Sequence, residues 1–191
     1  HQYRHVVGSV GTEVPGVEIQ IRDENGNILE PHSTGEVCVR GPNIMKGYYN
    51  NVEGTREAFW PGGWFRSGDV GVLDENGYLF IVDRLKDMII SGGENVYSLE
   101  VEEVLYAHPD VQECAVIGTP DKEWGERVTA VILPKPGQTI DPKELKDFLK
   151  ARLSAYKVPK RLFMVDDFPR SPAGKLLKRK LRESFLKGDD S

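Results

Sequence analysis

Apolar and polar residues alternate in the first part of the chain. Residues 17–21 read VEIQI and residues 36–40 read EVCVR, so every second side chain is apolar. Strict alternation of this kind predicts strands with one buried face. The segment DENG occurs at residues 23–26 and again at 74–77, and its Asn-Gly pair is typical of tight hairpin turns. Short strands joined by such turns predict that residues 1–82 are all-β, folded as a small barrel or a curled sheet.

The alternation stops in the segment DRLKDMIISGGEN, residues 83–95. Four charged residues separate two apolar runs there, and a Gly-Gly pair follows. A continuous strand would not carry such a polar segment in its middle, because the period of two is lost. We therefore predict a joint between two domains, residues 1–84 and residues 85–191, with a hinge near residues 83–87.

After the joint, the sequence mixes helical and strand periods. Ser98 is placed to cap a helix whose apolar stripe is Val101, Val104 and Leu105, and Pro109 is expected to end it. This change of period predicts that the second domain contains both helices and strands.

Strands are expected at residues 111–118 and 128–133, with a polar loop at 119–127 between them. A last strand is expected at residues 162–165 and a last helix at 176–186. The tail at 188–191 is expected to be frayed.

A further helix is predicted after residue 140. The segment DPKE, residues 141–144, is an aspartate-led capping box with proline at the first helical position. Leu145, Phe148, Leu149 and Leu153 then fall on one face. Together, the predicted elements give a β-barrel-like subdomain followed by a small α+β domain.

Composition narrows the class of protein. With 39% hydrophobic and 29% charged residues, the chain has the composition of an ordinary globular protein. No apolar run approaches the ~20 residues that span a membrane, and the net charge of −5 argues against nucleic acid as the main partner. Cys38 and Cys114 lie in separate predicted strands, and the four histidines show no metal-ligand spacing. We expect a cytoplasmic protein with no metal site in this chain.

Five short motifs occur in order over roughly residues 8–181. They are GEVCVRGP at 35–42, GY at 47–48, WFRSGD at 64–69, the segment at 83–95, and PRSPAGKLLKRKL at 169–181. In this order and at this spacing they closely resemble the motifs of the adenylate-forming ligases, which include acyl-CoA synthetases, luciferase and the adenylation domains of peptide synthetases.

The resemblance implies the C-terminal part of that fold and an ATP-dependent acid–CoA ligase. A carboxylic acid and ATP would give acyl-AMP and pyrophosphate, and coenzyme A would then displace AMP. Overall similarity favours fatty acids. The phosphate loop and the Tyr-Gly-x-Thr-Glu segment of the family are not found in this sequence. We therefore expect a missing N-terminal region of the same enzyme, which would also carry the Mg2+ ligands.

By the same resemblance, Lys175 is the essential lysine of the adenylation step. Joining a carboxylate to a phosphate brings two anions together, and a positioned ammonium offsets the charge. A flexible lysine suits this role better than a planar guanidinium. The alternative is that Lys175 only begins a solvated basic helix, as most clusters of Lys and Arg do.

Asp69 and Arg84 match the residues that hold the ribose of ATP and of the acyl-adenylate. A carboxylate can accept hydrogen bonds from both ribose hydroxyls, and Gly68 lets the backbone approach closely. Read without the family, Asp69 is a turn aspartate and Arg84 belongs to an exposed salt bridge.

Lys86 matches the hinge residue about which the C-terminal domain of the family rotates between the two half-reactions. The segment Ser91, Gly92, Gly93 and Glu94 matches the loop presented to the thiol in the second half-reaction. Glycines suit a narrow pantetheine tunnel because they leave the backbone bare. The alternative is an ordinary Gly-Gly hairpin turn.

Three residues depart from the usual motifs. Ser67 stands where threonine is usual, Asp83 where glycine often precedes the arginine, and Pro172 where a small or hydroxyl residue is common. None of these departures removes a charge that the mechanism needs.

Two other functions compete with the acid–CoA ligase. The parent would instead be an adenylation domain serving a carrier protein, or the isolated chain would be a non-catalytic module with weak nucleotide affinity. In the isolated chain, the face of the β-region that packs on the missing part would be exposed, and self-association through it is expected.

Overall fold

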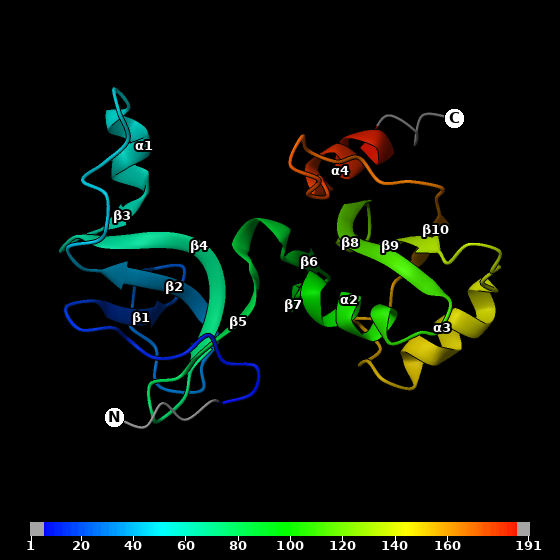
Figure 1. Ribbon diagram of the computed structural model, residues 1–191, viewed down its shortest axis with the longest axis horizontal. Coiled ribbons are helices and arrows are strands. Elements are labelled where there is room, and N and C mark those ends of the chain that lie inside the picture. The colour runs from blue at the N-terminus through cyan, green and yellow to red at the C-terminus, as the bar shows by residue number, and fades with distance from the viewer. Residues whose placement is uncertain (1–5, 187–191) are drawn as a thin grey trace. The chain divides into compact units, whose positions relative to one another are not determined.

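The computed structural model describes residues 6–186. The chain divides into two compact units, His1–Lys86 and Asp87–Ser191 (Figure 1). The division falls inside the segment where the alternation of the sequence stops, whereas the hinge itself stays a prediction. The tail at 188–191 lies outside the described residues.

The first unit is a curled antiparallel sheet, as the alternation predicts. Its strands are β1 (Glu18–Arg22), β2 (Gly35–Arg40), β3 (Phe59–Trp60), β4 (Trp64–Leu73) and β5 (Leu79–Arg84). The order is β1-β2-β4-β3, and β5 also pairs with β4, which bends strongly (Figure 1). The register shifts on the β2–β4 and β4–β5 ladders, and such bulges increase local bending and twist.

The two DENG segments form matching turns. In each, the aspartate Oδ1 accepts backbone N–H groups from the residues two and four positions later, at 2.9 and 2.8 Å. Gly26 and Gly77 close the turns at φ 83° and 79°, in the left-handed region that glycine tolerates. The turn of Asp74 joins β4 to β5. The turn of Asp23 returns to the end of β1 through an isolated bridge between Arg22 and Ile28.

The expectation that residues 1–82 are all-β is wrong at one place. A short helix, α1 (Val52–Glu57), lies between β2 and β3, and the Asn51 side chain caps it by accepting the N–H of Gly54 at 2.8 Å. None of the α1 residues is buried. A six-residue helix without a buried face leaves no periodic apolar signal in the sequence.

The second unit is a five-stranded mixed sheet. Its strands are β6 (Ile89–Ser91), β7 (Glu94–Val96), β8 (Val111–Asp121), β9 (Gly125–Pro134) and β10 (Arg161–Met164). Strand β9 pairs with β8 antiparallel, with β10 parallel, and with β6 through one bridge. Strand β10 is the last strand, and it begins at Arg161, one residue before the start at residue 162 that the sequence pattern predicts.

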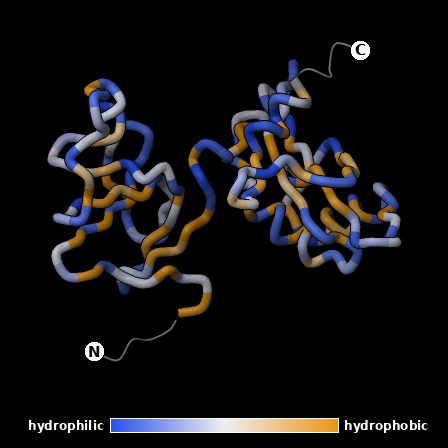
Figure 2. Tube along the Cα trace, turned by 45° about the horizontal axis from the view of Figure 1, so that its top comes forward, coloured by the Kyte–Doolittle hydropathy of each residue, from blue (hydrophilic) through white to orange (hydrophobic). Residues whose placement is uncertain are grey.

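Alternate residues of β8 and β9 serve two separate cores. The tube in Figure 2 shows apolar residues gathered in the interior of this unit. Val116 and Ala130 belong to the larger core, with α2 (Ser98–Tyr106) and α3 (Pro142–Lys150). Ile117 and Val131 belong to the smaller core, with Leu181 of α4 (Lys178–Leu186). Because successive strand side chains point to opposite faces, helices cover both faces of this sheet.

The segment 119–127 is not the polar loop that we expected. Strands β8 and β9 continue through it as one long hairpin, and only residues 122–124 are left for the turn. The hydroxyls of Thr119 and Thr129 are 2.8 Å apart, and Arg127 forms an ion pair with Asp121. Polar cross-strand pairs of this kind stabilise the ladder without any apolar alternation.

Ser98 does not cap α2, contrary to the prediction. Tyr97 occupies the N-cap position and makes no side-chain cap hydrogen bond. Ser98 is fully buried, and its hydroxyl accepts a hydrogen bond from the Lys178 ammonium at 2.8 Å. The helix ends at Tyr106, before Pro109, and the last helix begins at Lys178 instead of residue 176.

Both cysteines are free and buried, Cys38 on β2 and Cys114 on β8. Burial raises the pKa of Cys38 to about 11 and that of Cys114 to about 12, so both remain protonated thiols near neutral pH. Within residues 6–186, no helix has the length and apolar character needed to cross a membrane. In the same part of the chain, no group of three or more His, Cys, Asp or Glu side chains is placed to hold a metal ion.

The predicted cap of α3 is confirmed and can be tested. The Asp141 carboxylate accepts the backbone N–H groups of Lys143 and Glu144 at 2.7 and 3.1 Å. We expect Asp141→Ala to lower the free energy of unfolding of the second unit by ~1 kcal/mol, because two helix N–H groups lose their acceptor. Urea unfolding measures the loss.

Asp147→Ala is the matched control. Asp147 lies on the same helix, and among the described residues its carboxylate pairs only with the exposed Lys150, at 3.1 Å. Such a surface pair contributes roughly 0–1 kcal/mol, so a smaller change is expected. Equal losses for the two variants would contradict the capping role.

Candidate functional site

Asp69 and Arg84, predicted to share one ligand, lie side by side in the first unit. They are directly opposite each other in the β4–β5 register, and Arg84 Nε is 3.2 Å from Asp69 Oδ1. The Asp69 N–H donates to the Ser67 hydroxyl at 3.0 Å. The side chain of Arg84 is 61% exposed and that of Asp69 is 30% exposed. The pair therefore offers a carboxylate acceptor and guanidinium donors that solvent can reach.

An open hollow of about 340 Å³ lies beside this pair. It is lined by Ser67, Gly68, Arg84, Leu85 and Lys86. Gly68 has φ +72° and no side chain, so its backbone is open to a ligand. Two cationic side chains and exposed backbone favour a ligand that carries hydroxyls or negative charge.

A larger hollow of about 890 Å³ occupies another part of the first unit. Its lining includes Ile44, Met45, Phe59 and Trp60 as well as the cationic residues Arg40, Lys46 and Arg56. It contains none of the residues predicted to act on a nucleotide. Of the two hollows, only the smaller one is lined by a residue of the predicted nucleotide pair, Arg84.

Lys86 lies in the 3₁₀ helix η1 (Leu85–Asp87), directly after β5. Its side chain is exposed, and none of the η1 residues is buried. Leu85 and Lys86 are exposed, so little packing restricts the backbone at the predicted hinge residue.

The segment Ser91–Glu94 forms a two-residue hairpin turn between β6 and β7. Gly92 and Gly93 have φ values of 61° and 84°, and Ser91 pairs with Glu94 across the turn. The Gly92 N–H donates to the carbonyl of Trp124 at 2.8 Å. The hairpin turn that we considered as the alternative is therefore the observed geometry, and nothing lies within 4 Å of the position that a Cβ atom would take at Gly93.

Trp124 was not anticipated from the sequence. Its side chain lies against Gly92, where a Cβ atom would come within 2.5 Å of the ring atom Cε3. Trp124 is 44% exposed, and the Lys160 ammonium is 6.0 Å from the ring centroid. The only signal in the sequence is a tryptophan in a polar segment, which alternation treats as a loop.

Lys175 closes a tight turn in the second unit. Its carbonyl accepts the N–H of Ser171 at 2.8 Å, and its own N–H donates to the Ser171 hydroxyl at 3.1 Å. Gly174 has φ 79°, which this turn requires. The Lys175 side chain is exposed, and no ion pair holds its ammonium among residues 6–186. The turn therefore presents an uncompensated positive charge.

Both ends of this turn are attached to the unit. Arg170 donates to the carbonyl of Gly174 at 3.2 Å and forms an ion pair with Glu113 of β8. The hydrogen bond with Glu113 raises the pKa of Arg170. Leu176 packs against the smaller core. These contacts come from residues about 60 positions apart, so local sequence patterns did not reveal them.

The lysine turn and the Gly-Gly turn are built on different cores. Ile89 and Val96, which flank the glycines, belong to the larger core, whereas Leu176, next to Lys175, packs on the smaller one. Within the described residues, no hydrogen bond or ion pair links Lys175 to Ser91–Glu94. The structure thus unites Asp69 with Arg84 but keeps the lysine apart from the glycines.

Family models match two parts of the chain. The model of the AMP-binding enzyme matches residues 1–49, and that of the AMP-binding enzyme C-terminal domain matches residues 100–175. An oxalate–CoA ligase of Arabidopsis thaliana is 44% identical over 182 residues, which are 95% of this chain and 35% of the relative. A long-chain-fatty-acid–CoA ligase of Mycobacterium tuberculosis is 44% identical over 178 residues, 93% of this chain and 35% of the relative.

Solved structures agree with these matches. The crystal structure of ATP-bound MatB from Rhodopseudomonas palustris aligns with a TM-score of 0.90 at 42% identity, covering 96% of this chain and 37% of that chain. The chain therefore spans about a third of the length of the relatives that it matches.

The contact between Gly92 and Trp124 predicts unequal effects of two neighbouring substitutions. Gly92→Ala places a methyl group against the ring, whereas nothing lies within 4 Å of a Cβ at Gly93. Both residues have positive φ, so both variants carry backbone strain. We expect Gly92→Ala to cost about 1–3 kcal/mol more than Gly93→Ala, because the ring or the turn must shift. Urea unfolding compares the two, and equal losses would disprove the close contact.

Proposed function

The chain belongs to the family of AMP-binding, adenylate-forming enzymes, and from this premise we propose that it is the C-terminal part of an ATP-dependent acid–CoA ligase. In the first half-reaction, the carboxylate attacks the α-phosphorus of ATP, giving acyl-AMP and pyrophosphate. In the second, the thiol of coenzyme A attacks the acyl carbon, and AMP leaves. The observation that carries the proposal is the pairing of Asp69 with Arg84 beside an open hollow.

Asp69 and Arg84 are proposed to bind the ribose of ATP and of acyl-AMP. The carboxylate of Asp69 accepts from the ribose hydroxyls, and Arg84 orients it through the 3.2 Å contact. The glycine at position 68 leaves room for the sugar at the backbone. The proposed role of Asp69 and Arg84 is to bind the nucleotide, not to act as a general base.

Lys175 is proposed to act in the first half-reaction. Its ammonium compensates the negative charge that accumulates as carboxylate and phosphate come together. It forms no covalent bond to either group. The closed turn of Ser171 and Lys175 fixes the backbone from which this side chain extends. Absence of an ion-pair partner in the described part of the chain leaves its charge available.

The Gly-Gly turn is proposed to act in the second half-reaction. Bare backbone at Gly92 and Gly93 suits the narrow passage of a pantetheine arm. Since the two turns are built on different cores, a rotation of the second unit about Lys86 would withdraw one and present the other. This arrangement supports Lys86 as the hinge.

Fatty acids are the proposed acid substrates, on overall similarity. The relatives that match are named as ligases of acids as different as oxalate and long-chain fatty acids. The residues that shape the acid pocket are proposed to lie in the upstream region, together with those that bind the Mg2+ accompanying ATP.

The parent is proposed to work in the cytoplasm, and the isolated chain is proposed to self-associate. Val7, Val10 and Val14 are 85%, 66% and 60% exposed in the first unit. Exposed aliphatic side chains this close together favour contact with another protein surface.

Lys175→Ala tests the first half-reaction in the full-length enzyme. We expect acyl-AMP formation, followed as pyrophosphate release, to fall by about 10²-fold or more, because a preorganised charge is lost. Conversion of supplied acyl-AMP to the thioester should be nearly unchanged. Lys180→Ala, at an exposed position of α4, is the control and should leave both steps intact. An equal fall in both half-reactions would show that Lys175 has another role.

Lys86→Pro tests the hinge in the same enzyme. Proline fixes φ near −65°, so rotation about this residue is restricted. We expect thioester formation to slow more than adenylate formation, measured separately in single-turnover assays. Lys86→Arg, which keeps free rotation, should restore the ratio of the two rates. An unchanged ratio in the proline variant would refute the assignment.

A further inference from the structure

We propose that Asp87 and Arg182 are positioning residues for Lys175, because their ion pair fastens helix α4 and the lysine turn to the first residue of the second unit. This inference rests on the proposed function of Lys175. Neither residue needs to contact a substrate.

The orientation of α4 sets the position of the lysine turn. Helix α4 begins at Lys178, three residues after Lys175, so little chain is available to absorb a movement of the helix. Of the α4 side chains that the structure describes, Leu181 alone is buried. One buried leucine, with Phe185 partly buried beside it, is a narrow apolar stripe for a helix. Apolar packing alone therefore holds α4 weakly.

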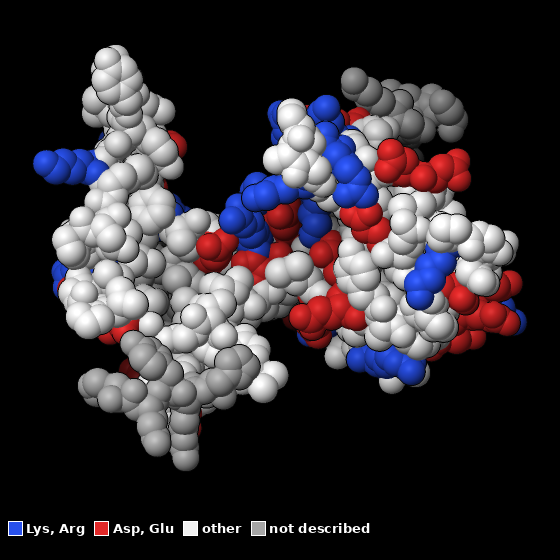
Figure 3. All heavy atoms as spheres, viewed as in Figure 1, with Lys and Arg blue, Asp and Glu red and all other residues white. Residues whose placement is uncertain are grey.

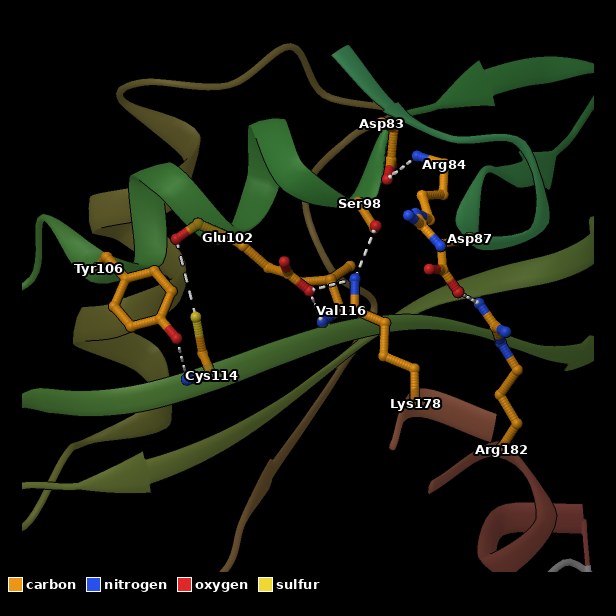
Figure 4. A network of polar contacts seen from close by, with 10 residues as sticks. All are labelled: Asp83, Arg84, Asp87, Ser98, Glu102, Tyr106, Cys114, Val116, Lys178 and Arg182. Atoms are coloured by element: carbon orange, nitrogen blue, oxygen red, sulfur yellow. Dashed lines mark hydrogen bonds and ion pairs between the residues drawn. The ribbon is translucent and has the colours of Figure 1, made fainter. Parts of the chain in front are cut away.

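Polar contacts supply what the apolar stripe lacks, and basic side chains gather over α4 (Figure 3). At the start of the helix, the Lys178 ammonium is 2.7 Å from Glu102 Oε1 and 2.8 Å from the Ser98 hydroxyl (Figure 4). The same Glu102 oxygen accepts the N–H of Val116 at 2.6 Å. The side chains of Lys178 and Glu102 are only 18% and 9% exposed. This anchor ties the first turn of α4 to α2 and β8.

Arg182 provides a second anchor one helical turn later. Its Nη2 is 2.9 Å from Asp87 Oδ1, with side-chain exposures of 26% and 14% (Figure 4). Residues four positions apart lie on the same face of a helix, so Lys178 and Arg182 both project from one face of α4 toward the rest of the unit. One anchor would leave α4 free to pivot, whereas two hold its axis.

The second anchor attaches α4 to the residue that directly follows the proposed hinge. Asp87 is the last residue of η1 and directly follows Lys86, the proposed hinge. A partly buried, charge-assisted hydrogen bond is short and directional. The ion pair between Asp87 and Arg182 therefore couples α4 rigidly to the residue that follows the hinge. When the unit rotates about Lys86, the lysine turn moves together with Asp87.

Arg179 of the same helix makes a clear contrast. Its side chain is 83% exposed, and within residues 6–186 it pairs only with Glu183 of the same helix, at 3.5 Å. This pair does not connect α4 to any other element. Arg179 therefore matches Arg182 in charge, size and helix but lacks the anchoring contact.

The test compares both half-reactions in the full-length enzyme. We expect Arg182→Ala to slow adenylate formation by about 10- to 100-fold, the order that misplacing a catalytic group costs. Thioester formation from supplied acyl-AMP should change little, because the Gly-Gly turn is built on the other core. The KM for ATP should hold, since Asp69 and Arg84 are untouched. Arg179→Ala should alter neither step, and Arg182→Lys should recover much of the lost rate.

Asp87→Asn separates loss of the ion pair from loss of the arginine itself. It should reproduce the defect of Arg182→Ala, and the double variant should be no worse than either single one, since one interaction is lost in all three. Additive defects, or an equal fall of both half-reactions, would overturn the positioning role.

Amide hydrogen exchange over residues 176–186 tests the anchor without any reaction. Exchange there should be faster in Arg182→Ala than in the unmodified enzyme and unchanged in Arg179→Ala. Unchanged exchange in Arg182→Ala would overturn the inference. The full-length enzyme could also fail to adenylate any acid while exchange is still faster in Arg182→Ala. That outcome would refute the proposed function but support the ion pair as an anchor of α4.

Discussion

The structure depends above all on one constraint, that the β8–β9 hairpin must fill two cores at once. Side chains alternate across a strand, so Val116 faces α2 and α3 while its neighbour Ile117 faces α4. Each face needs its own cover, and the chain supplies a different turn on each. The Gly-Gly turn is attached to the larger core, and the lysine turn to the smaller one. Their separation is therefore a consequence of strand geometry.

The ion pairs between elements of this chain orient those elements more than they stabilise the fold. Glu102 with Lys178, and Asp87 with Arg182, connect elements that share few apolar contacts. Burying such pairs costs desolvation, so they are a weak source of stability, but they accept only one geometry. Glu36 and Arg66 form another such pair, between the neighbouring strands β2 and β4, with Arg66 Nε 2.9 Å from Glu36 Oε2.

Local patterns predicted those features whose contacts are local. The DENG turns depend on an aspartate and the next four residues, and the cap of α3 depends on Asp141 and the next three. Prediction failed where distant partners decide. Ser98 has the chemistry of a cap but is held by Lys178, 80 residues away. Helix α1 has no buried face, and the long hairpin is stabilised across its strands, so neither carries a periodic signal.

The sequence by itself determined the family motifs and the residue types of the candidate site, because these are properties of short segments. Only the tertiary structure decided how they meet. The β4–β5 register places Asp69 opposite Arg84, and chain closure brings Arg182 to Asp87 across 95 residues. It also showed that Trp124 lies against Gly92. Pairing between distant residues depends on how strands align and how helices pack, and no local pattern encodes that alignment.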